Sequence, residues 1–277
     1  MTSRWSLRSL PGMWCAGVTE QRVTRFREQG AIAERWRRRA RLGLLHRRIP
    51  AYSSKASKHE LRELVGRDDP LILEIGCNDG TDTAEFLAVF PRCAIHCFEC
   101  DPRPIAQFRR RIDDGRCQLH ELAVSDRDGT ATLHMSGGTH PGARKEDWDL
   151  SSSLLLPKKH LERHPWVTFE RTCQVPTIRL DTWAARFIPD RIVDFIWMDV
   201  QGAEHLVISG GGATFARTRF CYFEYYNIEM YAGQRTLREI LKALKTYRPL
   251  ATYQGYNALA ANAAINSEPA SSLAGKR

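Results

Sequence analysis

Glycines and carboxylates at residues 74–99 have the types and spacing of a nucleotide-binding turn. Glu74 lies in a short apolar run, and Gly76-x-x-x-Gly80 follows it directly. Glycines let the backbone approach a ligand closely, and the N-terminus of a following helix offers free N–H groups. Glu99 ends the next apolar run, where a carboxylate can accept hydrogen bonds from both hydroxyls of a ribose. The spacing is not the G-x-G-x-x-G of dinucleotide-binding turns, which disfavours a dinucleotide ligand.

Two carboxylates further along the chain are candidates for acid–base chemistry. Asp199 follows the apolar run 192–198, and Glu224 lies near the end of another apolar run. Ligands of α/β sheets bind at the carboxyl ends of strands, so both side chains are expected near the same ligand. Asp199 is the best candidate for a general base, with Glu224 and His205 as further candidates. The alternative for Asp199 is a structural role, capping the turn that contains Gly202.

The elements that must position these residues alternate along the chain. Apolar runs predict strands at 71–75, 94–99, 118–124, 192–198 and 220–226. Amphipathic or capped segments predict helices at 59–66, 84–90, 101–112, 181–187, 203–208 and 236–246. Thr81 or Thr83 is expected to cap the second of these helices and Asp181 the fourth. A closing hairpin is expected from 250–253 and 258–264. The pattern predicts an α/β fold: a Rossmann-like, mostly parallel sheet flanked by helices, with a closing antiparallel hairpin.

Residues 136–176 interrupt this alternation. They follow an exposed strand predicted at 130–135 and contain few periodic apolar positions. The segment carries a group of aromatic and histidine side chains: His140, Trp148, His160, His164 and Trp166. A loop of this length within a compact domain is usually functional or disordered, so it is either a substrate-covering segment or a surface insertion.

The positive charge of the chain is confined to its start. The net charge is +9 over 277 residues, and residues 1–50 hold 12 Arg, no Lys and 3 Glu, which accounts for all of it. The remainder is neutral, so a nucleic-acid-binding core is not expected. We predict a basic extension and linker at 1–58, one domain at 59–265 and a frayed tail at 266–277. The extension is either simply solvated or makes weak contact with a membrane surface or nucleic acid.

Cysteine usage and hydropathy indicate the setting of the protein. Several of the eight Cys fall within apolar runs, where a thiol packs as a small hydrophobe. This suggests reduced thiols and a cytoplasmic location. No apolar run approaches the ~18 residues of a membrane-spanning helix, and no secretory signal is expected. The sequence does not indicate the oligomeric state.

Several short stretches resemble the FkbM-type methyltransferases, a class I methyltransferase family. They are EIGCNDG at 74–80, FE at 98–99, AVSD at 123–126, IRLD at 178–181 and MDVQGAE at 198–204, with FE at 223–224 and YAG at 231–233. The resemblance implies a fold that binds S-adenosylmethionine (SAM) and transfers its methyl group to a hydroxyl oxygen of a small molecule or sugar. Many members carry Lys and Glu where this chain has Trp197 and Gln201, so roles known for those positions are not carried over.

The resemblance also implies which residues hold the cofactor and act on the acceptor. The cofactor-binding set is Glu74, Gly76, Asn78, Asp79, Gly80, Glu99, Ala123 and Val124, the last two beside the adenine. Asn78 stands where many members have a third glycine, and asparagine tolerates the left-handed backbone well. Asp199 lies on the methyl-donor side, consistent with a role as base or in positioning the acceptor.

Other functional interpretations remain open from the sequence. A nicotinamide-dependent oxidoreductase shares the strand, turn and ribose carboxylate, and a degenerate methyltransferase fold would bind without turnover. Cys93-x-x-x-Cys97-x-x-Cys100 matches the spacing of a radical-SAM iron–sulfur cluster. On a strand, however, Cys93 and Cys97 share one face and Cys100 points to the other, so three converging thiolates and a metal site are not expected.

Overall fold

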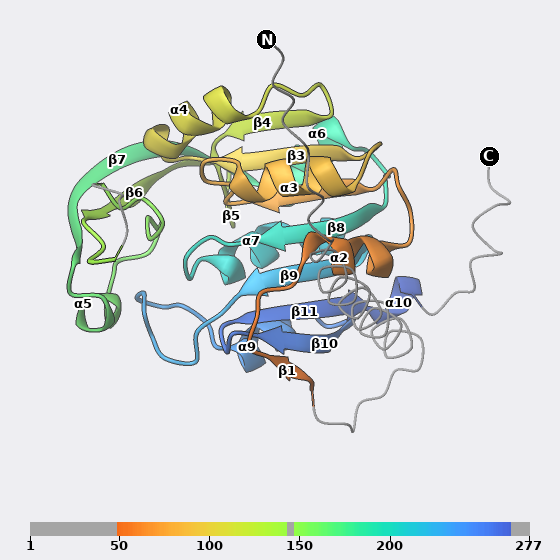
Figure 1. Cartoon of the computed structure of the whole chain (residues 1–277). Coiled ribbons are helices and arrows are strands. Elements are labelled where there is room, and N and C mark those ends of the chain that lie inside the picture. Colours follow the sequence, from red (N-terminus) through yellow and green to blue (C-terminus); the bar gives the residue numbers. More distant parts are fainter. Residues whose placement is uncertain (1–48, 143–146, 267–277) are drawn as a thin grey trace, which may run out of the picture.

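The computed structural model describes residues 49–142 and 147–266, and its main feature is an eight-stranded sheet (Figure 1). The order across the sheet is β1 (Ala51–Tyr52), β10 (Tyr247–Tyr253), β11 (Asn257–Asn262), β9 (Thr218–Glu224), β8 (Val193–Met198), β2 (Leu71–Ile75), β3 (Ala94–Glu99) and β4 (Cys117–Glu121). β11 is antiparallel to both neighbours, and every other adjacent pair is parallel. The parallel sheet with a closing antiparallel hairpin is confirmed.

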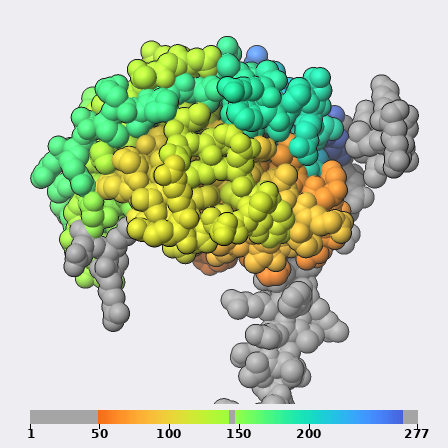
Figure 2. Space-filling model, turned by 90° about the horizontal axis from the view of Figure 1, so that it is seen from above, coloured from red at the N-terminus to blue at the C-terminus, as the bar shows by residue number. Residues whose placement is uncertain are grey.

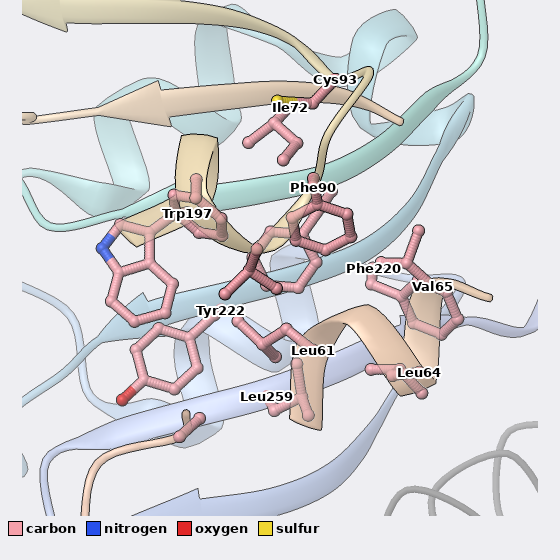
Figure 3. Packing of buried hydrophobic residues seen from close by; sticks show 14 of the residues in the cluster. Leu61, Leu64, Val65, Ile72, Phe90, Cys93, Trp197, Phe220, Tyr222 and Leu259 are labelled. Carbon is pink, nitrogen blue, oxygen red and sulfur yellow. The ribbon is translucent and has the colours of Figure 1, made fainter. Parts of the chain in front are cut away.

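Helices cover both faces of the sheet. The first face carries α2 (Lys58–Val65), α3 (Thr81–Val89) and α4 (Pro102–Arg111), and the second α6 (Leu180–Phe187), α7 (Glu204–Gly210), α8 (Gly212–Ala216) and α9 (Leu237–Ala243). A short helix, α10 (Ala263–Asn266), ends the described chain. On the first face Trp197 of β8 stacks on Tyr222 of β9 with ring centroids 4.1 Å apart, beneath α2 (Figure 3). The sheet is therefore buried on both faces, as its nearly continuous apolar strands require.

A smaller three-stranded sheet extends from one end of the molecule. It consists of β5 (Ala123–Ser125), β7 (Val167–Arg179) and β6 (Gly129–Gly138), in the order β5-β7-β6. β6 and β7 form a long antiparallel hairpin, and the chain between them contains α5 (His160–Arg163). The green hairpin residues lie at one end of the molecule in Figure 2. We call residues 129–179 the hairpin insertion.

The sequence prediction was wrong at several boundaries. The strand expected at 118–124 is two strands, because the chain turns at Leu122 and β5 joins the smaller sheet. The loop expected at 136–176 is shorter at both ends, since β6 and β7 extend into it. Within the predicted segment 1–58, residues 51–52 form β1, which pairs with β10. Residues 1–48 of that segment and the tail from 267 lie outside the described residues.

Two predicted helix caps were also wrong. α3 begins at Thr81 with Gly80 at the N-cap and no capping side chain, and the Thr83 hydroxyl instead donates to Glu74. Asp181 lies in the first turn of α6, and its carboxylate accepts hydrogen bonds from the N–H groups of Ala213 and Thr214 in α8. A capping residue read from local sequence can thus serve a different helix that tertiary packing brings to it.

None of the helices in the described part of the chain is long and apolar enough to cross a membrane. The described cysteines are all free thiols. The cytoplasmic location expected from cysteine usage stays a prediction.

Candidate active site

The turn after β2 has the backbone conformation that its glycine spacing predicts. Gly76 has φ +85° and Asn78 has φ 47°, both in the left-handed region. A Cβ at Gly76 would lie 1.9 Å from the carbonyl oxygen of Asp199, so only glycine fits. The N–H groups of Gly76 and Cys77 both donate to the carbonyl of Phe98. The turn therefore draws the ends of β2, β3 and β8 together.

The Glu99 carboxylate at the end of β3 organises the backbone around this turn. It accepts hydrogen bonds from the N–H groups of Asn78 (2.9 Å), Cys100 (2.7 Å) and Asp101 (2.8 Å). Burial raises the pKa of Glu99 to about 7, although the three N–H donors favour the ionised form. A carboxylate has about four lone-pair sites, so one remains for a ligand hydroxyl.

Beside Glu99 a largely apolar cavity opens between the sheet and the smaller sheet, and we call it the inner cavity. It is lined by Glu99 and by Phe98, Leu122, Ala123, Val124 and Leu133, among others, and contains ≈ 490 Å³ of empty space, including solvent at its mouth. A largely apolar cavity with the Glu99 carboxylate in its wall suits the chemistry of a purine nucleoside, because the base needs apolar faces and the ribose needs an acceptor for its hydroxyls.

A larger cleft, which we call the outer cleft, adjoins the inner cavity. It contains ≈ 1760 Å³ of empty space by the same measure, and Gly76 and Asp199 line both spaces. The N-terminal turn of α3 borders the cleft through Thr81 and Asp82. A ligand lying across Gly76 would therefore have one end in the inner cavity and the other in the outer cleft.

Two carboxylates, the buried Glu224 and the partly buried Asp199, meet in the outer cleft through one amide side chain. The side-chain nitrogen of Gln201 donates to Asp199 Oδ1 (2.7 Å) and to Glu224 Oε2 (2.8 Å). The Tyr226 hydroxyl donates to the other oxygen of Glu224 at 2.9 Å. Gln201 Oε1 lies 3.0 Å from the Tyr231 hydroxyl, on the side away from the carboxylates. The sequence marked Asp199 and Glu224 as candidates but did not indicate the bridge between them.

The protonation of this pair is set by its burial. Burial raises the pKa of Asp199, against the hydrogen bond from Gln201 and the charge of Lys55. Burial and the neighbouring charge of Asp199 raise the pKa of Glu224 well above its usual range. Two like charges in a desolvated site disfavour each other, and the charge of Lys55 favours the ionised form of Asp199, so Asp199 is the member that ionises more readily.

Two lysines that the sequence did not single out lie around Asp82 at the edge of the outer cleft. Lys55 and Lys58 both bond to Asp82, at 3.0 Å and 2.7 Å. Burial lowers the pKa of Lys58, whose ammonium lies 3.2 Å from the centre of the Trp197 ring. Burial also disfavours the charged form of Lys55, but its ion pair with Asp82 has the larger effect, so the pKa of Lys55 is raised. No motif signals Lys55, because it precedes α2 and reaches the cleft only through folding.

An aromatic wall closes the outer cleft on the side of the hairpin insertion. The five aromatic and histidine residues singled out in the sequence, His140, Trp148, His160, His164 and Trp166, all line the cleft. The rings of Trp148 and Trp166 are perpendicular, with centroids 4.7 Å apart. Such a corner offers apolar ring faces beside the polar residues of the sheet.

Residues 148–154 separate the two spaces, and we call this segment the strap. Trp148, Leu150 and Ser151 line the outer cleft, whereas Ser152, Ser153 and Leu154 line the inner cavity. The strap is therefore a shared wall of both sites.

Arg103 anchors the strap to α4. Its guanidinium donates to Asp101, to Asp147 and to the Ser152 hydroxyl. Ser153 in turn donates to the carbonyl of Gln201 at 2.8 Å. These bonds connect the strap to both the α4 side and the β8 side of the site.

Eight of the residues predicted for the site line one of the two spaces: Gly76, Asn78, Asp79, Glu99, Ala123, Val124, Asp199 and Glu224. The other three do not. The Glu74 carboxyl lies beneath α3 and accepts the Thr83 hydroxyl at 2.6 Å. Gly80 ends the turn, where a Cβ would meet the ring of Phe108. His205 lies on α7 and lines neither space.

Solved structures with related folds are only distantly similar. The fibrillarin pre-rRNA processing protein of Methanococcus jannaschii is 10% identical, with a TM-score of 0.37 over 70% of this chain and 67% of the other. The precorrin-6y C5,15-methyltransferase of Geobacter metallireducens is 11% identical, with a TM-score of 0.36 over 68% of this chain and 71% of the other. Similarity at this level carries no inference about substrate.

Sequence comparison is more informative. The 2-O-methyltransferase NoeI of Sinorhizobium fredii is 44% identical over 207 residues, which cover 74% of this chain and 83% of NoeI. The Methyltransferase FkbM domain matches residues 74–257, a range that runs from Glu74 on β2 to Asn257 on β11 and contains the hairpin insertion. The chain belongs to the FkbM methyltransferase family.

Proposed function

We propose that the protein transfers the methyl group of SAM to a hydroxyl oxygen of a small-molecule or sugar acceptor. Methyltransferases of this family and fold use SAM in general. The observation that carries the proposal is the meeting of the two spaces at Gly76 and Asp199. A largely apolar cavity with Glu99 in its wall opens there into a cleft that contains Asp199 and Glu224, as a methyl donor and a hydroxyl acceptor require.

The residues around the inner cavity fit the adenosyl part of SAM. Ala123 and Val124 would flank the base, and the free lone-pair site of Glu99 would accept a ribose hydroxyl. Gly76, Asn78 and Asp79 would hold the part that crosses into the outer cleft, because all three line that cleft. Glu74 and Gly80 would act indirectly, by fixing α3 and the turn.

Asp199 is the residue that we assign to proton transfer. When bound, SAM supplies a methyl group on a positively charged sulfur, which keeps the electron pair of the broken bond. Asp199 accepts the proton of the acceptor hydroxyl as the oxygen forms its bond to carbon. Its position at the end of β8, between the two spaces, supports this role. The strap excludes water by closing the site from the side of the insertion.

The wall of the outer cleft supports an acceptor with a ring. Trp148 and Trp166 offer aromatic faces, while Gln201, Glu224 and Asp82 offer groups that pair with hydroxyls. A sugar combines apolar ring faces with several hydroxyls, so it matches both kinds of wall. NoeI is named a 2-O-methyltransferase, which agrees with a hydroxyl acceptor.

Calorimetry of the full chain with SAM, its demethylated product, NADH and NADPH tests the cofactor. We expect SAM and its product to bind and the two nicotinamides not to bind. If a folded protein binds no SAM, the assignment of the inner cavity is wrong.

A screen of sugar and glycolipid acceptors against the wild type and Asp199→Asn then tests the reaction. The variant should retain SAM affinity and lose about 10²- to 10⁴-fold in kcat, because the amide cannot accept the proton. Full activity in the variant would remove Asp199 as the base. SAM binding without turnover on any acceptor would favour a degenerate, binding-only protein.

A further inference from the structure

We propose that Gln201 is a positioning residue that holds Asp199 and Glu224 as one proton-sharing pair, with Asp199 the ionised member that faces the acceptor. The inference rests on the proposed function, because it assigns Gln201 a task in deprotonating a hydroxyl acceptor. It starts from the way the amide is placed between the two carboxylates.

Gln201 donates both of its side-chain N–H groups to carboxylates. Its nitrogen lies 2.7 Å from Asp199 Oδ1 and 2.8 Å from Glu224 Oε2, so each N–H group has its own acceptor. The residue has φ 51°, a backbone conformation that L side chains rarely adopt. This uncommon conformation is held by the Ser153 hydroxyl, which donates to the Gln201 carbonyl. The amide is thus built into the site.

The surroundings also determine which end of the amide faces the carboxylates. In the opposite orientation the amide oxygen would face two carboxylate oxygens, and an ionised carboxylate repels it. On the far side the Tyr231 hydroxyl lies 3.0 Å from Gln201 Oε1 and 2.9 Å from the carbonyl of Ser151. Tyr231 itself packs against Gly202, where a Cβ would come within 2.9 Å of its ring. The orienting group is therefore rigidly placed.

The charged and titratable groups around the pair come from several neighbouring elements: Lys55, Asp82, Glu204, Tyr222, Tyr226, Tyr231 and Tyr256. Lys55 is the cation whose charge acts on Asp199. Glu204 accepts the N–H group of Val200 and caps the turn after β8. The Tyr226 hydroxyl donates to Glu224 alone, whereas Gln201 donates to both carboxylates.

This arrangement gives the two acids different tasks. A neutral hydrogen-bond donor between two desolvated carboxylates favours the ionised form of each without adding charge. Because two negative charges so close together repel each other, the pair as a whole keeps one proton. Burial raises the pKa of both groups, but the charge of Lys55 favours ionised Asp199, and Glu224 is the more completely buried of the two. Glu224 therefore holds the proton, and Asp199 takes the proton of the acceptor hydroxyl.

The substitution Gln201→Met tests the assignment because it keeps the length of the side chain and removes both N–H bonds. We expect the acidic limb of the pH profile of kcat/KM to move to higher pH by about one unit, because the ionised carboxylate loses a charge-assisted hydrogen bond. We expect kcat to fall by about 10- to 100-fold and SAM affinity to stay unchanged. Tyr231→Phe, which removes only the hydroxyl beside the amide, should give a smaller shift in the same direction.

Gln234→Met is the matched control. Gln234 also makes bonds at both ends of its amide, to the backbone of Tyr226, Ile228 and Tyr231, but it touches neither carboxylate. Its replacement should lower stability without moving the acidic limb. If Gln201→Met binds SAM and its acidic limb stays where it is in the wild type, Gln201 is only structural and the proposal is wrong.

Carbon-13 NMR titration of the Asp199 and Glu224 carboxyl groups separates this inference from the proposed function. The titration needs no acceptor and no turnover. In the wild type we expect two coupled steps, with Asp199 titrating first, and in Gln201→Met an upward shift of the Asp199 step. If the protein binds no SAM but shows this shift, the proposed function is wrong, whereas the role of Gln201 in holding the two carboxyl groups stands. If the Asp199 and Glu224 carboxyl groups titrate independently in the wild type, they do not share a proton and the proposal is wrong.

Discussion

The parallel half of the main sheet and the hairpin insertion build the same site in different ways. In the sheet, β2, β3 and β8 end side by side, and each places its functional residue within a few positions of the strand end: Gly76, Glu99 and Asp199. In the insertion, functional side chains come from a segment between two long antiparallel strands. The first region depends on local strand-and-turn geometry, whereas the second depends on contacts with the rest of the molecule.

The strap shows how the second region is tied to the first. Ser152 donates to the buried carboxylate of Asp101 at 2.9 Å, and the Ser136 hydroxyl donates to the carbonyl of Trp148. These side-chain bonds supplement a few isolated backbone bonds, such as the bridge between Ser153 and His134, where the strand ends have continuous backbone pairing. Under the proposed function, the acceptor side of the site can therefore differ in shape while the cofactor side keeps its geometry.

The largest effect is expected from a change to the sheet region. Gly76→Ala would place a Cβ 1.9 Å from a backbone oxygen of Asp199 at a residue with φ +85°. The end of β8 must then move, so we expect SAM affinity to fall about a thousandfold, or about 4 kcal/mol. Calorimetry on the folded variant measures this effect.

Gly233→Ala is the control for Gly76→Ala, because it introduces backbone strain at a positive φ without a steric clash. Gly233 has φ +79°, but a Cβ there would meet nothing within 4 Å. It should cost about 1 kcal/mol of stability, through backbone conformation alone, and leave SAM affinity unchanged. Equal losses of SAM affinity in the two variants would mean that close approach at Gly76 is unimportant.

A buried carboxyl on the same side predicts a pH effect on stability. The pKa of Glu74 is raised by burial to about 7, from 4.5 in the unfolded chain. Between these values the folded state keeps a proton that the unfolded state has released, so stability is full below pH 4.5 and falls as the pH rises to about 7. The loss is about 3 kcal/mol, because each pKa unit corresponds to about 1.4 kcal/mol.

Glu74→Gln removes this titration. In urea unfolding across the same pH range, its stability should fall less steeply than that of the wild type. Parallel stability curves for the two proteins would show that the Glu74 carboxyl has an ordinary pKa in the fold.

The smallest effect is expected in the insertion. Trp148→Ala removes one face of the aromatic corner, so KM for a sugar acceptor should rise about tenfold, while SAM affinity stays unchanged. Phe187→Ala is the control, because Phe187 is a partly exposed aromatic residue on α6 that lines neither space. A tenfold loss of SAM affinity in Trp148→Ala would show that the two regions are not separable.

Sequence patterns predicted the sheet side well for a physical reason. Leu71–Ile75 and Ala94–Glu99 are strands with the predicted bounds, since their apolar runs suit strands buried on both faces. The glycine spacing identified the turn because positive φ and close approach leave few other residues possible. The strand expected at 118–124 failed because periodicity cannot show that neighbouring halves of one run join different sheets.

The sequence by itself determined the α/β class, the glycine turn and the carboxylates at the strand ends, because strand burial and backbone conformation are local requirements. Tertiary structure alone decided that Lys55 and Asp82 pair beside the cleft, and that the strap forms a wall of both spaces. It also decided that Gln201 bonds to Asp199 and Glu224 together. These contacts join segments far apart in the chain, and their energies depend on burial and on partner geometry that local sequence does not record.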